Sequence, residues 1–281
     1  MFATWTAPVP AFTEWTYADA VDDQQKPQVI RRATALLRAL AAAEPTGATT
    51  SELASATGLA RPTVHRLLTT LADEGLADRD HRSGRWSIGP ELYLLGSLAA
   101  SRYDIVDIAR PVLRDLARTT GESTFLSVRR GDETVCVAAE EGSFPLRSHV
   151  LHIGIRLPLG VASAGLVILA HLAPHDVADY LDRVDLTREW GERHARDAVT
   201  ERLVRTRETG YSLNPGLLVE GSWGMGAAVF DDRDEPAWAL SVTGVESRFG
   251  VDRRSHLGDL LLLEAHRLTR ALRQRHPVGD T

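Results

Sequence analysis

Basic and hydroxyl side chains gather between residues 61 and 70 of the 281-residue sequence. If Val64, Leu67, Leu68 and Leu71 turn inward with helical spacing, the side chains left outside include no acid. Guanidinium groups neutralise phosphates and bind guanine edges, and short polar side chains reach base edges and phosphate oxygens. The segment therefore predicts a helix that contacts a nucleic acid. Its candidate contacts are Arg61, Thr63, His65, Arg66 and Thr69.

A second basic group lies in a predicted hairpin just after this helix. Residues 76–79 and 85–88 pattern as two short strands joined by a turn at 80–84. Positive charge on such a hairpin suits contact with the sugar-phosphate backbone or with an adjacent minor groove. Any single arginine is more often ordinary solvated surface, so only the whole arrangement favours DNA. The hairpin contributes Arg79, Arg82 and Arg85, and the preceding helices add Arg31, Arg32 and Thr50.

Three helices and a hairpin are needed to position these groups. Apolar spacing predicts helices over 29–41, over 50–56 and from residue 61 onward, with Thr50 or Ser51 capping the second. Gly58 supplies the tight turn before the third helix. This order is that of a winged helix-turn-helix, in which the helix after the turn enters the major groove.

The remainder of the chain predicts a second domain, so the fold class is α+β with two domains. Residues 90–102 form a predicted linker helix that is apolar on more than one face, and we expect it to pair with the same helix of a second chain. Residues 103–281 mix helical and strand periods. We interpret residues 1–27 as a tail, although Trp5 and Trp15 leave open a short helix that packs on a partner subunit. In the second domain, predicted helices cover 105–119, 159–172, 252–275 and two stretches within 174–209, and predicted strands cover 123–129, 134–140, 226–230 and 237–242.

Composition narrows the class of protein further. Hydrophobic residues make up 43% and charged residues 25%, which is typical of a folded chain. Residues 28–88 carry eight arginines against six acids, a net charge of +2, whereas the whole chain carries −6. A basic head on an acidic body fits a DNA-binding protein whose other domain has a different task. We find neither a membrane-length apolar run nor a leader segment, so we expect a cytoplasmic protein without a membrane partner.

Several chemistries lack the residues that they need. The only lysine is Lys26, which excludes a Walker A loop, a protein kinase and a Schiff-base enzyme. The single cysteine, Cys136, can build neither an internal disulfide nor a structural zinc site, and we expect a buried, inert thiol. We therefore expect no metal, no cofactor and no catalytic residue. No third ligand accompanies either histidine pair, His149 with His152 or His171 with His175.

The sequence resembles the isocitrate-lyase-regulator (IclR) family of bacterial transcription regulators over roughly residues 29–275. The resemblance runs through both halves of the chain in the same order, which makes it more specific than a helix-turn-helix motif alone. It is carried by RATALL at 32–37, SELA at 51–54, GL at 58–59, TVHRLLTTL at 63–71, Gly75, IG at 88–89, Gly154, PL at 158–159, GY at 210–211, AAVFD at 227–231 and ALSVTG at 239–244.

The resemblance implies a winged helix-turn-helix domain, a linker helix and a GAF-like α/β domain that binds a small effector. It also implies dimers, often paired into tetramers, on pseudo-palindromic operators in double-stranded DNA. The family's effectors are commonly small organic acids, aromatic acids included. The pocket positions that it implies are Ser163, Ala164, Asn214, Ser222, Gly224, Ser241 and Thr243, to which we add the neighbouring Trp223 and, in the preceding loop, His152.

Two features of these positions bear on the ligand. Ser241 and Thr243 are two apart on one predicted strand, so both hydroxyls face one side and suit a carboxylate or an amide. The competing interpretation is that both hydroxyls bond to the backbone. Asn214 and Gly224 stand where family members often have an acid and a cysteine, which favours a larger, aromatic ligand over a two- or three-carbon acid. Trp223 is either part of that site or ordinary core or rim.

We expect a ligand-responsive transcription regulator, and repression rather than activation. One alternative is an enzyme that acts on the molecule bound by the second domain, although the sequence has no GxSxG or HExxH motif. A second alternative is an architectural DNA-binding protein that is indifferent to small molecules.

Overall fold

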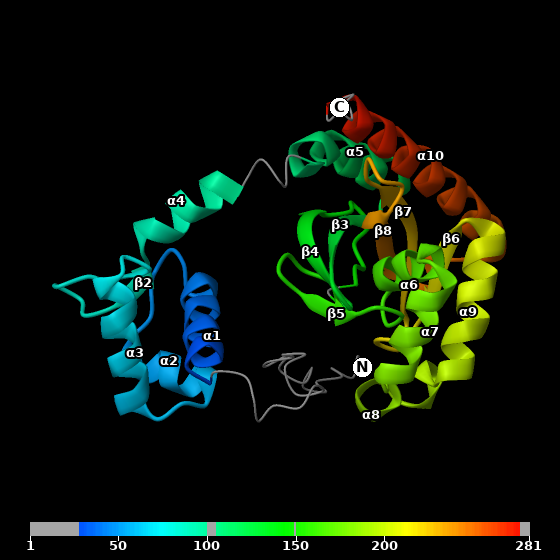
Figure 1. Cartoon of the computed structure of the whole chain (residues 1–281). Helices are drawn as coiled ribbons and strands as arrows, with labels where there is room; N and C mark the ends of the chain where they lie inside the picture. Colours follow the sequence, from blue (N-terminus) through cyan, green and yellow to red (C-terminus); the bar gives the residue numbers. More distant parts are fainter. Residues whose placement is uncertain (1–27, 100–104, 149, 276–281) are drawn as a thin grey trace, which may run out of the picture. The chain divides into compact units, whose positions relative to one another are not determined.

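The computed structural model describes residues 28–99, 105–148 and 150–275. The chain divides between Tyr103 and Asp104 into two compact units (Figure 1). Within the described ranges, no helix combines the length and the apolar character needed to cross a membrane.

In the first unit, residues 28–88 form three helices and a two-stranded wing, as predicted. The helices are α1 (Gln28–Ala42), α2 (Thr50–Thr57) and α3 (Arg61–Asp73), and the wing pairs β1 (Ala77–Arg79) with β2 (Trp86–Ile88) in antiparallel register. Gly58 ends α2 in the left-handed conformation at φ +65°, which provides the tight turn. Leu36, Leu40, Leu53, Val64, Leu68 and Trp86 form the buried core between them.

The predicted cap of α2 is wrong by one residue. Thr49, and not Thr50 or Ser51, is the N-cap residue. Its hydroxyl accepts from the Glu52 amide at 3.3 Å, and the Glu52 carboxylate accepts from the Thr49 amide at 2.7 Å. This reciprocal capping box needs an acid three residues after the cap, so the position of Glu52 selects Thr49.

The predicted linker helix is present as α4 (Pro90–Ala99) as far as the described residues extend; residues 100–102 lie outside them. No residue of α4 is buried. Tyr93, Leu94, Leu95 and Leu98 are between 50% and 79% exposed, which is unusual for four apolar side chains in ten residues.

The second unit is built on a six-stranded antiparallel sheet in the order β5-β4-β3-β8-β7-β6. Helices α5 and α10 pack against each other and on one face, while α6 lies on the other face with α9 behind it (Figure 1). The strands are β3 (Ser123–Arg130), β4 (Glu133–Glu140), β5 (Arg156–Pro158), β6 (Tyr211–Pro215), β7 (Ser222–Phe230) and β8 (Pro236–Val245). The helices are α5 (Ile105–Thr120), α6 (Ser163–His171), α7 (Pro174–Arg183), α8 (Thr187–Trp190), η3 (Glu192–His194), α9 (Arg196–Thr209), η4 (Glu246–Arg248) and α10 (Val251–Arg275).

The two faces of this sheet differ in chemistry. Met225, Val229 and Leu240 turn toward the core shared with α5 and α10. The α6 face is apolar at Ala228 and Ala239, and further along the same strands it carries the buried hydroxyls of Ser241 and Thr243. Side chains alternate along a strand, so residues 224 and 226 lie on the same face of β7 as Ala228, and residues 241 and 243 on the same face of β8 as Ala239. The two rows are in register, with Gly224 opposite Thr243 and Gly226 opposite Ser241.

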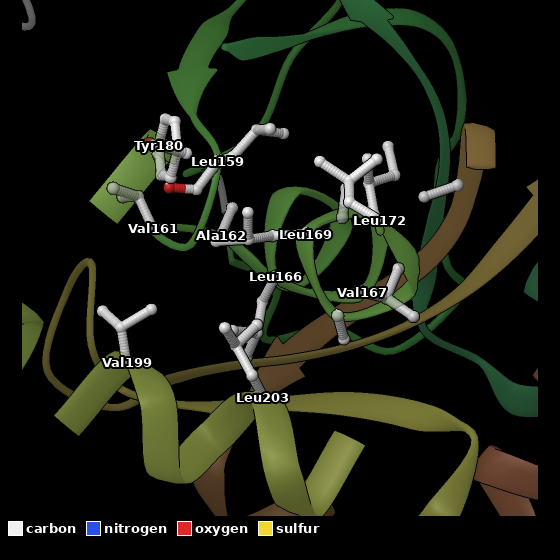
Figure 2. Close-up of a cluster of buried hydrophobic side chains, with 14 of the residues drawn as sticks. Leu159, Val161, Ala162, Leu166, Val167, Leu169, Leu172, Tyr180, Val199 and Leu203 are labelled. Carbon is white, nitrogen blue, oxygen red and sulfur yellow. Dashed lines mark hydrogen bonds between the residues drawn. The ribbon is translucent and has the colours of Figure 1, made fainter. Parts of the chain in front are cut away.

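The α6 side has its own core, which Figure 2 shows with Val199 and Leu203 of α9 turned toward α6. Every residue from Ser163 to Ala170 is buried, so small side chains are needed for α6 to lie close to the sheet. The Tyr180 hydroxyl of α7 donates to the Leu159 carbonyl at 2.7 Å and fixes the chain before α6.

Three predictions for this unit need correction. The helix predicted over 159–172 begins only at Ser163, because Gly160 adopts φ +85° and the chain turns there. Strands β5 and β6 were not predicted, and β7 begins at Ser222 and not at residue 226. Short edge strands give little periodic signal, and the glycines at 221, 224 and 226 suggest a loop where the backbone is in fact paired.

Candidate DNA-contacting surface and ligand pocket

Helix α3 presents the predicted polar side chains on one exposed face. Arg61, His65, Arg66 and Thr69 are exposed, and Thr63 is half-buried. The Arg61 and Arg66 guanidinium groups make no hydrogen bond or ion pair with any described residue, so both are available to a partner. The Thr69 hydroxyl donates to the His65 carbonyl at 3.0 Å, which leaves its oxygen free to accept a second bond.

Trp86, which the sequence did not mark as a functional residue, connects the wing to helix α3. It is 3% exposed, and its ring meets the His65 ring edge-on at 6.4 Å and the Arg79 guanidinium at 5.4 Å. Its indole N–H donates to the Thr50 hydroxyl at 3.2 Å. Trp86 also exchanges two backbone hydrogen bonds with Ala48. A large aromatic residue alternating inward in a predicted strand was the available signal.

The predicted wing arginines have different partners. The Arg85 guanidinium binds the Glu52 carboxylate at 2.9 Å and the Gly47 carbonyl at 2.9 Å, so it holds the base of the wing. The Arg82 amide donates to the Asp80 carboxylate at 2.8 Å, and its exposed side chain has no partner among the described residues. Of the α1 pair, both half-buried, Arg32 donates to the Gln28 side chain at 3.0 Å, and Arg31 likewise has a partner.

In the second unit, a small pocket lies where α6 begins, over the ends of β6, β7 and β8. The free volume in which a water molecule can be centred is about 10 Å³, room for roughly one water. Its walls are Val150, Leu151, Ala162, Ser163, Asn214, Leu218, Ser222, Trp223, Gly224 and Thr243. Six predicted effector positions are therefore brought together.

The other three predicted positions lie outside the walls of this pocket. Ser241 is on the neighbouring row of the sheet, opposite Gly226, and Ala164 is buried in the α6 core. His152 is exposed, its Nδ1 lies 3.0 Å from the Ile153 carbonyl oxygen, and it is not one of the pocket walls.

Ser241 and Thr243 carry buried hydroxyls that bond to nothing in the described protein. Ser241 is 0% and Thr243 is 6% exposed, and neither Oγ nor Oγ1 has a hydrogen-bond partner. The backbone bonding that the sequence left open is therefore not found. Because buried polar atoms are rarely left without a partner, these two hydroxyls, of which that of Thr243 belongs to a pocket wall residue, are candidate ligand contacts.

Asn214 and Gly224 are paired across β6 and β7, and each shapes the pocket. The Asn214 side chain is 4% exposed; its Nδ2 donates to the Val161 carbonyl at 2.7 Å and its Oδ1 accepts from the Leu217 amide at 3.0 Å. Both the nitrogen and the oxygen of the Asn214 amide are thus bonded to backbone. A Cβ at Gly224 would lie 3.2 Å from the Ser163 hydroxyl, so glycine leaves open the space in front of Ser163.

Two further residues close the pocket. Trp223 is half-buried and packs on Phe249, with ring centroids 6.2 Å apart, and on Arg254 at 5.4 Å, so it is both pocket wall and part of the α5–α10 core. The Ser222 hydroxyl lies 2.6 Å from the Ser148 hydroxyl of the loop between β4 and β5.

The start of α6 offers hydrogen-bond donors to this pocket. Its N-cap residue, Ala162, provides no side-chain cap. The first backbone N–H groups of a helix have no partner inside the helix, and the helix dipole favours an anion there. With Ser163 as the first helical residue, the pocket therefore combines amide and hydroxyl donors near the unbonded hydroxyl of Thr243.

Cys136 and the two histidine pairs are the groups that bear on thiol and metal chemistry. Burial raises the pKa of the Cys136 thiol to about 12, so at neutral pH it is protonated and a poor nucleophile. The structure places no cluster of three metal-binding side chains within the described ranges. His149 lies outside them, and Pro174 starts a new helix between His171 and His175.

A winged helix-turn-helix joined to an α/β domain with a polar pocket defines a DNA-binding regulator with a small-molecule sensor domain. The chain belongs to the IclR family of bacterial transcriptional regulators. Residues 29–81 match the model of the IclR helix-turn-helix domain, and residues 97–270 match that of the bacterial transcriptional regulator IclR C-terminal domain. The predicted family, fold class and function are thereby confirmed.

Individual relatives agree with this assignment. The chain is 32% identical over 236 residues to the HTH-type transcriptional regulator BhcR of Paracoccus denitrificans, which covers 83% of this chain and 84% of BhcR. It is 30% identical to the transcriptional repressor IclR of Escherichia coli, over 79% of this chain and 81% of that one. Among solved structures, HmgR of Pseudomonas aeruginosa has a TM-score of 0.64 with 27% identity, covering 88% of this chain and 99% of HmgR. An IclR homolog from Microbacterium hydrocarbonoxydans, complexed with 4-hydroxybenzoate, shares the fold at a TM-score of 0.68 with 21% identity, covering 86% and 99%.

Proposed function

We propose that this protein is a repressor that binds a pseudo-palindromic operator as a dimer and senses a small organic acid through its second domain. Residues 28–89 are the DNA-binding domain, 90–102 the linker helix and 103–281 the effector domain in this proposal. The repressor names of the Escherichia coli relative and of the acetate operon repressor of Salmonella typhimurium, 29% identical, support the direction of control. Such a protein acts on the chromosome, in the cytoplasm.

The observation that carries the ligand proposal is the buried, unbonded hydroxyl of Thr243, a residue that lines the same pocket as Ser163 at the uncapped start of α6. A carboxylate accepts hydrogen bonds from hydroxyls and from helix N-terminal amides, and none of the ten wall residues is cationic or anionic. Ser241 lies one row away, opposite Gly226, and its hydroxyl also contacts the ligand if the pocket widens in that direction.

An aromatic acid is our first candidate ligand. The absent side chain at Gly224 leaves space for a ring, and Val150, Leu151, Ala162 and Leu218 give that ring apolar wall to pack against. The solved relative complexed with 4-hydroxybenzoate makes that compound a rational first probe. Because the free volume is only about 10 Å³, such a ligand must move Val150 or Leu151 outward as it enters.

For DNA, we propose that α3 enters the major groove and that the wing lies over the flanking backbone. Arg61 and Arg66, which have no intramolecular partner among the described residues, are the base and phosphate contacts on α3, together with Thr63, His65 and Thr69. Arg82 is the phosphate contact of the wing. Arg85 is bonded to Glu52, and Thr50 accepts from the Trp86 indole, so both act by holding the wing and α2 in place and do not contact DNA themselves.

The proposal is tested by gel shift with the protein's own upstream DNA at fixed salt, with and without aromatic and aliphatic acids. We expect a sequence-specific complex that 4-hydroxybenzoate or a related acid dissolves or strengthens. Arg66→Ala should weaken specific binding by about 1 to 3 kcal/mol, whereas Arg82→Ala should weaken binding to all sequences equally. Unchanged operator affinity in Arg66→Ala would contradict the placement of α3 in the major groove.

We further propose that the second domain binds its ligand without converting it. The protonated state of Cys136 and the absence of lysine after residue 26 support this. Incubating the protein with a bound acid and following it by NMR is the test; product formation would favour the enzyme. A protein whose operator binding ignored every acid, and which bound none, would instead be architectural.

A further inference from the structure

Half of the pocket wall comes from one hairpin end. Asn214, Leu218, Ser222, Trp223 and Gly224, five of the ten wall residues, lie on the β6–β7 hairpin. The loop between the strands is closed by its own backbone, with the Gly216 amide donating to the Ser222 carbonyl and the Ser222 amide to the Val219 carbonyl, both at 3.0 Å. The shape of the pocket therefore depends on what holds this loop.

A side chain from outside the hairpin donates hydrogen bonds to the backbone of this loop. Arg193, in η3, donates from Nη1 to the Gly216 carbonyl at 3.0 Å and from Nη2 to the Pro215 carbonyl at 2.9 Å. A planar guanidinium can reach two adjacent acceptors at once, and its charge strengthens both bonds. Arg193 makes no ion pair with any described residue, so its hydrogen bonds are directed to these carbonyls.

Arg193 is itself held from the other side. Its carbonyl accepts from the Arg202 Nη1 of α9 at 2.8 Å. The next residue, His194, is 1% exposed, and its Nδ1 lies 2.9 Å from the Trp190 carbonyl oxygen. The segment that carries Arg193 is therefore anchored to α8 and α9 by bonds that do not involve the hairpin.

We propose that Arg193 is a positioning residue for the ligand pocket, although it is not one of the pocket walls. It acts through the Pro215 and Gly216 carbonyls on Asn214, which precedes them and spans from the Val161 carbonyl to the Leu217 amide. If these hydrogen bonds were lost, the peptide groups after Asn214 could rotate, and the wall formed by Asn214 and Leu218 would loosen. This inference rests on the proposed effector role of the pocket.

Local hydrogen exchange in the full-length protein tests the positioning directly and needs no ligand. In Arg193→Ala we expect amides of residues 212–224 to exchange about tenfold faster, the factor that corresponds to about 1.4 kcal/mol of local opening. Arg193→Lys, which can bond one carbonyl at a time, should give an intermediate increase. The control is Arg188→Ala, an exposed arginine of the neighbouring α8, which should leave exchange unchanged.

Faster exchange that also covers β3 and β4 would show a merely structural role for Arg193, and unchanged exchange in 212–224 would show none; either overturns the proposal. A second arm measures ligand binding by calorimetry, with 4-hydroxybenzoate and a panel of aliphatic acids. For a compound that binds the wild type, we expect Arg193→Ala to bind about tenfold more weakly, with unchanged operator affinity in the absence of ligand. Equal ligand affinity also overturns it. If no acid binds the wild type, the acid-sensing proposal fails, while the exchange result still decides whether Arg193 positions the pocket.

Discussion

Thr243 is the residue at which the proposed ligand contact and the stability of the fold make opposite demands. Its buried hydroxyl has no partner in the described protein, which costs about 1 to 3 kcal/mol. Thr243→Val replaces that hydroxyl by a methyl group of nearly the same size. We therefore expect Thr243→Val to raise the unfolding free energy by about 1 kcal/mol while weakening ligand binding. Chemical denaturation and calorimetry on the same preparation measure both quantities.

The matched control is Thr124→Val. Thr124 is equally buried in the same sheet, but its hydroxyl donates to the Leu113 carbonyl at 2.9 Å. This substitution should lower the unfolding free energy by about 1 kcal/mol and leave ligand affinity unchanged. A loss of stability in both variants would argue that the Thr243 hydroxyl is bonded after all.

Helix α4 is the element whose surface calls for a partner. Tyr93 and Leu98 are 76% and 79% exposed, and no α4 residue is buried within its own chain. We propose that α4 packs on its counterpart in a second copy. Leu98→Asp should then shift the protein toward monomers and weaken operator binding, because each half-site would be bound independently. Sedimentation velocity over a range of protein concentrations measures the shift.

Ser97→Asp is the control for added charge on α4, because Ser97 has little apolar surface to bury. An identical oligomer distribution for Leu98→Asp and the wild type would contradict the proposed interface. The same sedimentation data distinguish a dimer from the tetramer that the family resemblance implies.

At the scale of the whole molecule, the pocket and the operator must be coupled by one free energy. If a bound acid changes operator affinity by some factor, operator DNA changes acid affinity by the same factor, and couplings of about 1 to 3 kcal/mol correspond to roughly 5- to 150-fold. We expect calorimetry with and without operator DNA to return the factor that gel shift gives with and without acid. Unequal factors would mean that the acid acts outside the protein–DNA equilibrium.

Local features of the fold were predictable, whereas contacts between distant segments were not. The three helices and the wing of residues 28–88 follow from spacing and turn residues that act within a few positions. Asn214 is paired with Gly224 across two strands that a loop separates in sequence, and the hydrogen bond from Arg193 to the Pro215 carbonyl joins residues 22 positions apart. The pocket positions came from family resemblance, and no periodicity could show that the hydroxyl of Thr243 lacks a partner.

The small free volume of the pocket has a consequence for timing. A cavity with space for about one water molecule admits no ring until its walls separate. Acid binding should therefore wait on opening of the loop that carries Val150 and Leu151, so that the observed rate levels off as the concentration of acid rises. The height of that plateau would then measure how fast the pocket opens in the protein without ligand.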